Sequence, residues 1–432
     1  MIVKRGLLIL GWLLITSVVA GAEVEGAVTL EQLLREGDQN NPGLIRIAEQ
    51  VVAAQTKIDQ VASMPDPTLS LALSSYPIES LTADESPMTG NEIRLAQTYP
   101  FFGKLSARRS VASQQAFGFD AAYQDARLQL RQKIKDAWVR LLFQRQALIL
   151  TQRNLELIDD FITLTETRYA VGSGLQQNVL KAHLQRSKQL DQLLLLQQQE
   201  EATRAELNSL VGHATDRPLL TNTELSPASD RFELDALQEG AERRPLEQVY
   251  RAQREQAQAQ RDLARLDYRP DFTLWGSYRW RDDGLSDGGG DFVSAGVSFS
   301  LPVRRERRHA AVAEADSAVR LSHQRRNEWR NQVDLDIHRA LTAFEQAGRL
   351  AELYQTGILP QANQTFQATL SAYRVDQVDF LDLLDALMTL YRYQIDHIRA
   401  VSEQRRSLAK LEAAAALDID LLPNQTAVSG ER

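Results

Sequence analysis

The hydrophobic positions of this chain follow two different periods. Over most of the sequence they recur every three or four residues, in long stretches that contain neither glycine nor proline. One such stretch lies between Gly118 and Gly172, and its apolar stripe consists of Leu130, Ile134, Trp138, Leu141, Leu148, Leu155, Ile158, Ile162 and Tyr169. A narrow stripe of this kind is typical of helices that pack as coiled coils. The pattern predicts long helices over residues 104–171, 175–211, 303–356 and 361–415.

Four short segments instead alternate apolar and polar residues, which is the period of a half-buried β-strand. They cover about residues 68–77, 92–101, 272–281 and 292–301. A tilted strand needs about ten residues to cross a bilayer, and aromatic residues gather at the ends of these segments as they do at membrane interfaces. The alternation also fits two ordinary soluble hairpins. The Asp-rich connection at residues 282–291 suits a polar turn, and calcium is its alternative use.

The whole pattern occurs twice along the chain. Pro65-Asp66 recurs 205 residues later as Pro270-Asp271, and Tyr169 recurs 204 residues later as Tyr373. The second strand of each predicted hairpin ends at a proline, Pro100 or Pro302. A nearly constant offset over such a distance indicates duplication. We therefore expect a first repeat over residues 23–220 and a second over residues 221–432.

The N-terminus has the features of a secretory signal peptide. Lys4 and Arg5 precede an apolar run, and Ala20-Gly21-Ala22 follows it as a small-residue cleavage site. We expect residues 1–22 to be removed, with an uncleaved N-terminal anchor as the alternative. No later stretch is as hydrophobic, so the mature chain is either soluble outside the cytoplasm or embedded in a membrane through β-strands.

The amino-acid composition excludes several kinds of functional site. The chain has 432 residues, a formal net charge of −8 and no cysteine. The lack of cysteine excludes disulfides, thiol nucleophiles and a lipid anchor on cysteine, and the acidic balance argues against nucleic acid as a partner. The six histidines form no metal-binding motif, and no nucleotide-binding or nucleophile-elbow motif occurs. The sequence therefore predicts no enzyme, no cofactor and no dedicated metal site.

Four strands are too few to enclose a pore. A membrane β-barrel needs at least about eight strands, and each unpaired amide at an open edge costs several kcal/mol in lipid. If the strands span a membrane, the chain must therefore oligomerise. Three copies would supply twelve strands.

Motifs at the ends of the predicted long helices resemble those of the TolC family of outer-membrane efflux proteins. Arg168-Tyr169-Ala170-Val171-Gly172, followed by Asn178-Val179-Leu180, resembles the first periplasmic tip of that family. Tyr373-Arg374-Val375-Asp376, followed by Asp382-Leu383-Leu384-Asp385-Ala386, resembles the second. Pro100-Phe101-Phe102-Gly103-Lys104-Leu105 resembles the heavy-metal (CzcC/CusC-like) branch. The resemblance covers about residues 30–415.

This resemblance implies a mixed α/β membrane protein: a homotrimer with a shared β-barrel of four strands per chain, continuing into a long α-helical barrel in the periplasm. The implied place is the outer membrane of a Gram-negative bacterium, in contact with outer-membrane lipid. The implied partners are a periplasmic adaptor, or membrane fusion protein, and an inner-membrane pump of the RND type. The implied function is a passive exit duct for metal cations. Export of organic toxicants or drugs, type I protein secretion, and a soluble periplasmic coiled-coil scaffold remain as alternatives.

The resemblance also assigns candidate site residues. Two turns would contact the adaptor, and they comprise Val171, Gly172, Ser173, Gly174 and Leu175 in the first repeat and Val375, Asp376, Gln377, Val378 and Asp379 in the second. The channel gate would comprise Asp382, Asp385, Tyr373 and Asn178. Asp382 and Asp385 are three apart and share a helix face, so a trimer would place up to six carboxylates around its axis; an ordinary solvated face is the alternative. Asn178 and Val378 depart from the family pattern, which implies a neutral or missing latch.

Overall fold

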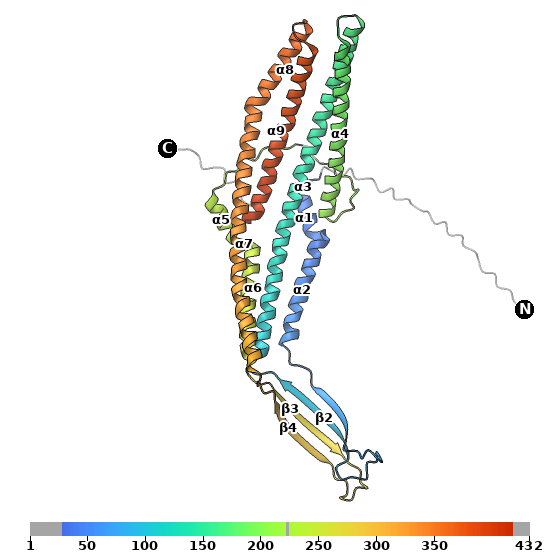
Figure 1. Ribbon diagram of the computed structural model, residues 1–432, viewed down its shortest axis with the longest axis vertical. Coiled ribbons are helices and arrows are strands. Elements are labelled where there is room, and N and C mark those ends of the chain that lie inside the picture. Colours follow the sequence, from blue (N-terminus) through green and yellow to red (C-terminus); the bar gives the residue numbers. More distant parts are fainter. Residues whose placement is uncertain (1–27, 222–223, 418–432) are drawn as a thin grey trace, which may run out of the picture.

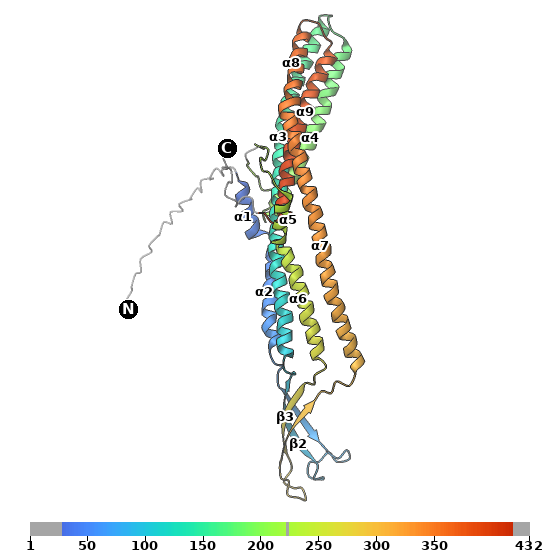
Figure 2. The same ribbon diagram turned by 90° about the vertical axis from the view of Figure 1, so that its left-hand side faces the viewer.

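The computed structural model describes residues 28–221 and 224–417. A β-sheet lies at one end of an elongated molecule, and a bundle of long helices extends from it (Figures 1 and 2). The predicted signal peptide lies outside the described residues. Within the described ranges, none of the helices combines the length and the hydrophobicity needed to span a membrane.

The sheet contains one hairpin from each repeat. Its strands β1 (Thr68–Ser74), β2 (Gly90–Tyr99), β3 (Phe272–Trp280) and β4 (Phe292–Phe299) are antiparallel and lie in chain order. The two hairpins therefore meet at the β2–β3 pair, while β1 and β4 form the edges. β2 and β4 end ahead of prolines, which cannot donate a ladder hydrogen bond.

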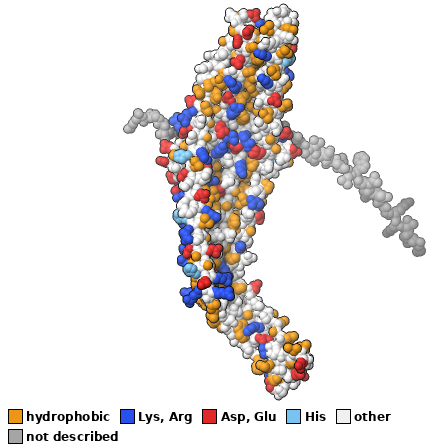
Figure 3. Space-filling model, in the orientation of Figure 1, with side chains coloured by type: hydrophobic (Ala, Val, Ile, Leu, Met, Phe, Trp, Pro, Cys, Tyr) orange, Lys and Arg blue, Asp and Glu red, His pale blue; other side chains and the backbone are white. Residues whose placement is uncertain are grey.

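The register of the strands gives the sheet one apolar face. Leu71 lies opposite Ile93, Leu95 opposite Gly276, and Leu274 opposite Val297. Large apolar side chains on this face are exposed, namely Leu69, Leu71, Leu73, Ile93, Leu95, Leu274, Tyr278, Val293, Val297 and Phe299. The opposite face carries polar contacts, such as the ion pair of Glu92 with Arg279 at 2.9 Å. Among the described residues, the sheet lies beyond the end of the helices (Figures 1 and 2), and hydrophobic side chains are visible on the surface of this end of the molecule (Figure 3).

The first repeat forms helices α1 (Leu30–Asn40), α2 (Pro42–Ala62), α3 (Lys104–Ala170) and α4 (Gln176–Leu210). Asn41 separates α1 from α2, and its side-chain oxygen accepts the N–H of Leu44 at 2.9 Å, with a proline at the first helical position. α3 contains 67 residues and is therefore about 100 Å long. It packs against α2, α4, α6 and α9 and so links the sheet to the far tip.

The second repeat forms α5 (Leu234–Glu242), α6 (Pro245–Leu266), α7 (Arg305–Leu353), α8 (Leu359–Arg374) and α9 (Phe380–Ala415). A π-helical segment, η1 (Tyr354–Ile358), joins α7 to α8 without interrupting the helical path. The expected helices over 303–356 and 361–415 were therefore divided at the wrong place: the chain reverses direction only after Arg374.

Pro360 explains both the expected break and its absence. Proline lacks an N–H, and its ring collides with the carbonyl four residues earlier in a regular helix. Here one wider turn accommodates the ring, and the N–H of Leu359 donates to the carbonyl of Tyr354, five residues back. The path of the helix is thus kept at the cost of one irregular turn.

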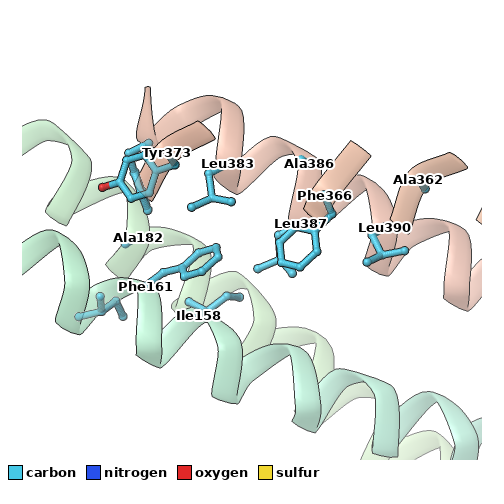
Figure 4. Packing of buried hydrophobic residues seen from close by; sticks show 12 residues of the cluster. Ile158, Phe161, Ala182, Ala362, Phe366, Tyr373, Leu383, Ala386, Leu387 and Leu390 are labelled. Carbon is cyan, nitrogen blue, oxygen red and sulfur yellow. The ribbon is translucent and has the colours of Figure 1, made fainter. Parts of the chain in front are cut away.

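The hydrophobic core is divided into separate clusters along the rod. The largest lies between the α3–α4 hairpin and the α8–α9 hairpin, near the tips (Figure 4). We call it the tip cluster; it contains Ile158, Phe161, Ile162, Ala182, Ala362, Phe366, Tyr373, Phe380, Leu383, Ala386, Leu387 and Leu390. Two further clusters lie where α1 and α5 pack against the long helices. Each cluster therefore stabilises its own level of the rod.

Candidate gate at the helical tips

The two helical hairpins end in turns of the same backbone design. In the first turn, the N–H of Ser173 donates to the carbonyl of Arg168 at 2.9 Å, and Gly172 has a φ of +78°. In the second, the N–H of Gln377 donates to the carbonyl of Ala372 at 3.0 Å, and Asp376 has a φ of +55°. Both are helix ends closed by a residue in the left-handed conformation. Aspartate adopts this conformation more readily than most residues, so the second turn forms without glycine.

Apolar side chains are exposed on both turns. Val171, Leu175 and Val375 are each at least 64% exposed. Gly174 lies so close to the backbone that an added Cβ would approach the Tyr169 nitrogen at 3.0 Å. The turn is thus compact, and it presents valine and leucine to the surroundings instead of burying them.

Tyr373 is almost fully buried in the tip cluster, at 4% exposure. Its ring lies 6.1 Å from that of Phe380, which in turn lies 6.2 Å from the ring of Phe161 on α3. Figure 4 shows Tyr373 and Leu383 lying across from Phe161, between the two hairpins. Tyr373 therefore takes part in the packing that holds the second hairpin against the first.

Arg168 makes the polar connection between the two tips. Its guanidinium lies 4.4 Å from the centre of the Tyr373 ring, donates to the Tyr373 carbonyl at 3.2 Å and forms an ion pair with Asp376. The same carbonyl, at the end of α8, also accepts the backbone N–H of Asp376 at 3.2 Å. One side chain from α3 thus stacks on the second hairpin, caps it and neutralises its turn.

Arg168 lies in the tip motif of the first repeat but is not among the predicted gate residues. A signal was present in the sequence, because Asp376 adds a negative charge to the tip of the second helical hairpin. The repeat brings an arginine to the other tip at a comparable level. Only the packing of the hairpins decides that these two charges meet.

The phenol of Tyr373 has a pKa above its usual value. Burial is the largest cause, because it disfavours the charged phenolate, and the nearby Asp376 carboxylate acts in the same direction. The positive charge of Arg168 and its hydrogen bond oppose this rise without cancelling it. Tyr373 is therefore a neutral hydrogen-bonding group at physiological pH.

A cleft of about 510 Å³ at the tip is lined by three of the four gate candidates, and Asp385 is not among its lining residues. Asn178, Tyr373 and Asp382 all contribute to its lining. Within the described part of the chain, no hydrogen bond joins the side chains of Asn178 and Tyr373; the backbone N–H of Asn178 donates to the Leu175 carbonyl at 3.0 Å. The sequence predicts a neutral or missing latch here. Within one copy, the polar contacts between the two tips are those of Arg168.

Asp382 and Asp385 lie on the first turns of α9. Both are exposed, whereas Leu383, Ala386 and Leu387 on the other side of the helix are buried in the tip cluster. The two carboxylates thus share the face of α9 that the chain leaves open. In residues 28–221 and 224–417, no group of three or more histidine, cysteine or acidic side chains is arranged to hold a metal ion.

Comparison with known proteins places this geometry in a family. The profile of the outer membrane efflux protein family matches residues 33–213 and 236–417. The chain is 21% identical, over 90% of its length and 90% of the relative's, to the cobalt-zinc-cadmium resistance protein CzcC of Cupriavidus metallidurans. It is 25% identical to the pyoverdine export outer membrane protein OpmQ of Pseudomonas putida, over 90% of this chain and 84% of that protein.

A crystal structure of CusC has the same fold. It superimposes with a TM-score of 0.75 at 15% sequence identity, covering 89% of this chain and 91% of that one. The resemblance to the TolC family inferred from the tip motifs is thereby confirmed. This chain belongs to the outer membrane efflux protein family, whose members are trimeric outer-membrane channels that work with a periplasmic adaptor and an inner-membrane pump.

Proposed function

We propose that three copies of this chain form the exit duct of a tripartite efflux system and that the duct passes metal cations passively across the outer membrane. The observation that carries the proposal is the four-stranded sheet, open at both edges and apolar on one uncovered face. In lipid such edges must be paired, and further copies of the chain would pair them. The long helices would then surround the path to the tips.

The tips supply the gate in this proposal. The tip cluster and Arg168 hold the second hairpin against the first, so that opening requires the α8–α9 hairpin to move away from α3. Asp382 and Asp385 would face the axis of the trimer and focus a negative potential there. The exposed Val171, Leu175 and Val375 would meet apolar residues of the adaptor.

Metal cations are the favoured substrate because of two independent features. The relative CzcC is named for cobalt, zinc and cadmium resistance, and the open face of α9 carries two carboxylates where a cation would pass. The relative OpmQ is named for pyoverdine export, so an organic substrate is the second candidate. Expression in a strain that lacks its own outer-membrane component would separate the two: cobalt and zinc tolerance should recover, and siderophore export should not.

The carboxylate pair can be tested by single-channel recording. Replacing both Asp382 and Asp385 with asparagine should weaken block of the current by divalent cobalt about tenfold, because most of the negative potential at the constriction disappears. Glu314→Gln, on α7 and remote from the tips, is the matched control and should leave the block unchanged. Equal block in all three proteins would remove the pair from the gate.

The trimer itself has a separate test. A soluble scaffold would stay in solution without detergent, whereas the proposed duct should need detergent and should migrate as an oligomer that heating converts to a monomer. A detergent-free monomer would contradict the proposal.

A further inference from the structure

A buried lysine joins the sheet to the helices inside one copy. Lys104 is the first residue of α3, and its side chain is only 5% exposed. Its ammonium group lies 2.8 Å from a carboxylate oxygen of Asp271 and donates to the Arg269 carbonyl at 3.1 Å. The backbone N–H of Phe101 donates to the same Asp271 oxygen at 2.8 Å. Asp271 thus ties the start of β3 to the start of the long helix that follows β2.

The contacts of Asp271 favour the charged form of its carboxylate. Burial by itself would raise the pKa of its carboxyl, but the hydrogen bonds from Lys104 and Phe101 and the charge of Lys104 outweigh it and lower that pKa. The carboxylate is therefore charged throughout the physiological range. The junction between the repeats is an ion pair with backbone support.

Lys104 and Asp271 each have a counterpart in the other repeat. The two counterparts lie at opposite edges of the sheet, because they adjoin β1 and β4, which are the edge strands. Asp66 lies 205 residues before Asp271, just ahead of β1, and Arg305 is the first residue of α7, as Lys104 is of α3. Both side chains are exposed, and neither makes an ion pair or a side-chain hydrogen bond with the residues that the structure describes.

In the trimer of the proposed function, β4 of one copy pairs antiparallel with β1 of the next. We propose that this contact repeats the register of the β2–β3 pair inside the chain, and that Arg305 forms an ion pair with Asp66 of the partner subunit. The inference rests on the trimer of the proposed function and adds to it a register and a pair of residues. We call this contact the subunit seam.

The duplication predicts the register of the seam. Moving the observed β2–β3 pairs by the repeat offsets, 202 residues forward for β2 and 205 back for β3, gives the expected pairs. Gln97 opposite Leu274 becomes Phe299 opposite Leu69 of the partner subunit. Leu95 opposite Gly276 becomes Val297 opposite Leu71 of the partner subunit.

The apolar face supports this register independently. The pairs place Phe299 and Val297 beside Leu69 and Leu71 of the partner subunit, and all four belong to the exposed apolar face within one copy. A slip by one residue would send the side chains of one strand to the opposite face. The repeat offsets come from the proline and aspartate motifs and not from the apolar face. The apolar face is therefore independent support for the register that the offsets predict.

The start of α7 differs from the start of α3 in one respect, and this difference affects the hydrogen bonds that we expect at the subunit seam. Arg305 lies three positions after Pro302, whereas Lys104 lies four positions after Pro100. The two residues are therefore matched by their place at the start of a helix and not by the 202-residue offset. The N–H of Val303, the counterpart of Phe101, donates to the Leu301 carbonyl at 2.9 Å. We therefore expect the ion pair at the seam without the supporting backbone hydrogen bond.

Cysteine cross-linking tests the register directly, because the chain has no cysteine of its own. The double variant Leu71→Cys with Val297→Cys should form covalent dimers and trimers under mild oxidation, since directly opposite residues lie within disulfide distance. Leu95→Cys with Gly276→Cys, an observed pair within one chain, should link without an increase in mass. Leu71→Cys with Ser298→Cys, one residue out of register, should give far less product.

The outcomes separate this inference from the function. A native oligomer in which Leu71→Cys with Val297→Cys stays monomeric on a denaturing gel would overturn the seam and leave the trimer standing. The absence of any oligomer would overturn both.

Charge reversal tests the ion pair. Asp66→Arg and Arg305→Asp should each raise the monomer fraction about two- to fivefold, the range expected for an exposed pair, and the double reversal should restore the trimer. Arg307→Asp, a neighbouring exposed arginine on α7, should fail to restore it in the Asp66→Arg background. A double reversal no better than its single variants would exclude the pair.

Discussion

The two helical hairpins of this molecule follow the same path from the sheet to the tip, but only one of them is a continuous helix over that distance. In the first hairpin, α3 is unbroken for 67 residues from the sheet to the tip. On the second, the same span is divided into 49 residues of α7, five of η1 and 16 of α8. A π-helical turn interrupts the regular hydrogen-bond ladder of a helix and is a common place for a helix to kink. We therefore expect the first helical hairpin to be the fixed support and the second to be the element that moves.

The contacts above the π-helical turn agree with this division of roles. The α8–α9 hairpin is attached to the α3–α4 hairpin chiefly through the tip cluster and through Arg168. Each attachment can be weakened by a single substitution that leaves the π-helical turn unchanged. Four predictions test the comparison, beginning with the largest expected effect.

Removing the aromatic anchor of the second hairpin should have the largest effect. Phe380 is 1% exposed, and truncating a buried phenylalanine costs about 3–5 kcal/mol. Phe380→Ala should therefore release the second hairpin and raise the closed-state conductance of the channel in a planar bilayer. Leu350→Ala, an exposed position on α7 below the π-helical turn, is the control. Equal conductance in both variants would mean that the tip cluster does not hold the hairpin.

A proline placed within α3 should interrupt the hydrogen-bond ladder of the first helical hairpin as Pro360 interrupts that of the second. Glu156 lies 204 residues before Pro360, is exposed and has no ion pair within the described ranges. A proline in a helix interior costs about 3 kcal/mol, so Glu156→Pro should lower the melting temperature and create a second bend. Pro360→Glu, the reciprocal change, should cost less than about 1 kcal/mol and should reduce channel opening. A Glu156→Pro protein as stable as the parent would show that continuity of α3 is unimportant.

Loss of the polar link should have an intermediate effect. Arg168→Ala removes a cation–π contact and a hydrogen bond to the end of α8, together worth about 1 kcal/mol. We expect an open probability several-fold higher in single-channel recordings. Arg374→Ala, an exposed arginine at the same level of the second hairpin, should have no such effect. If the two variants behave alike, general charge at the tips outweighs the specific link.

The smallest effect concerns pH. The unfolded chain loses the Tyr373 proton near pH 10.0, whereas the folded protein holds it to a higher pH, because burial raises this pKa. The stability that Tyr373 contributes is therefore complete below pH 10 and is lost as the pH rises through the raised value. Closure of the tips should weaken in that alkaline range, as followed by conductance. Tyr373→Phe should abolish the dependence, and an unchanged alkaline profile in that variant would assign it to another group.

The local features of this chain follow from its sequence alone. Period-two segments became strands and period-3.6 segments became helices, since each pattern requires only that one face of an element be apolar. The turn at residues 171–175 lies where Gly172 and Gly174 favour it. The turn at residues 375–379 was assigned by the family resemblance alone, because the helical pattern predicts one helix over residues 361–415. The adaptor contacts of these turns and the gate role of Asp382 and Asp385 stay predictions.

Other features depend on segments about 200 residues apart, and these were decided by the tertiary structure. Pro360 predicts a break when only its neighbours are considered, yet packing of α7 and α8 along α9 keeps the helix continuous through a π-helical turn. The meeting of Arg168 with Asp376, and of Lys104 with Asp271, depends on how the repeats lie against each other. The hydrophobic periodicity of a helix or strand determines which of its faces is buried. It does not determine which residue of a distant element lies opposite that face.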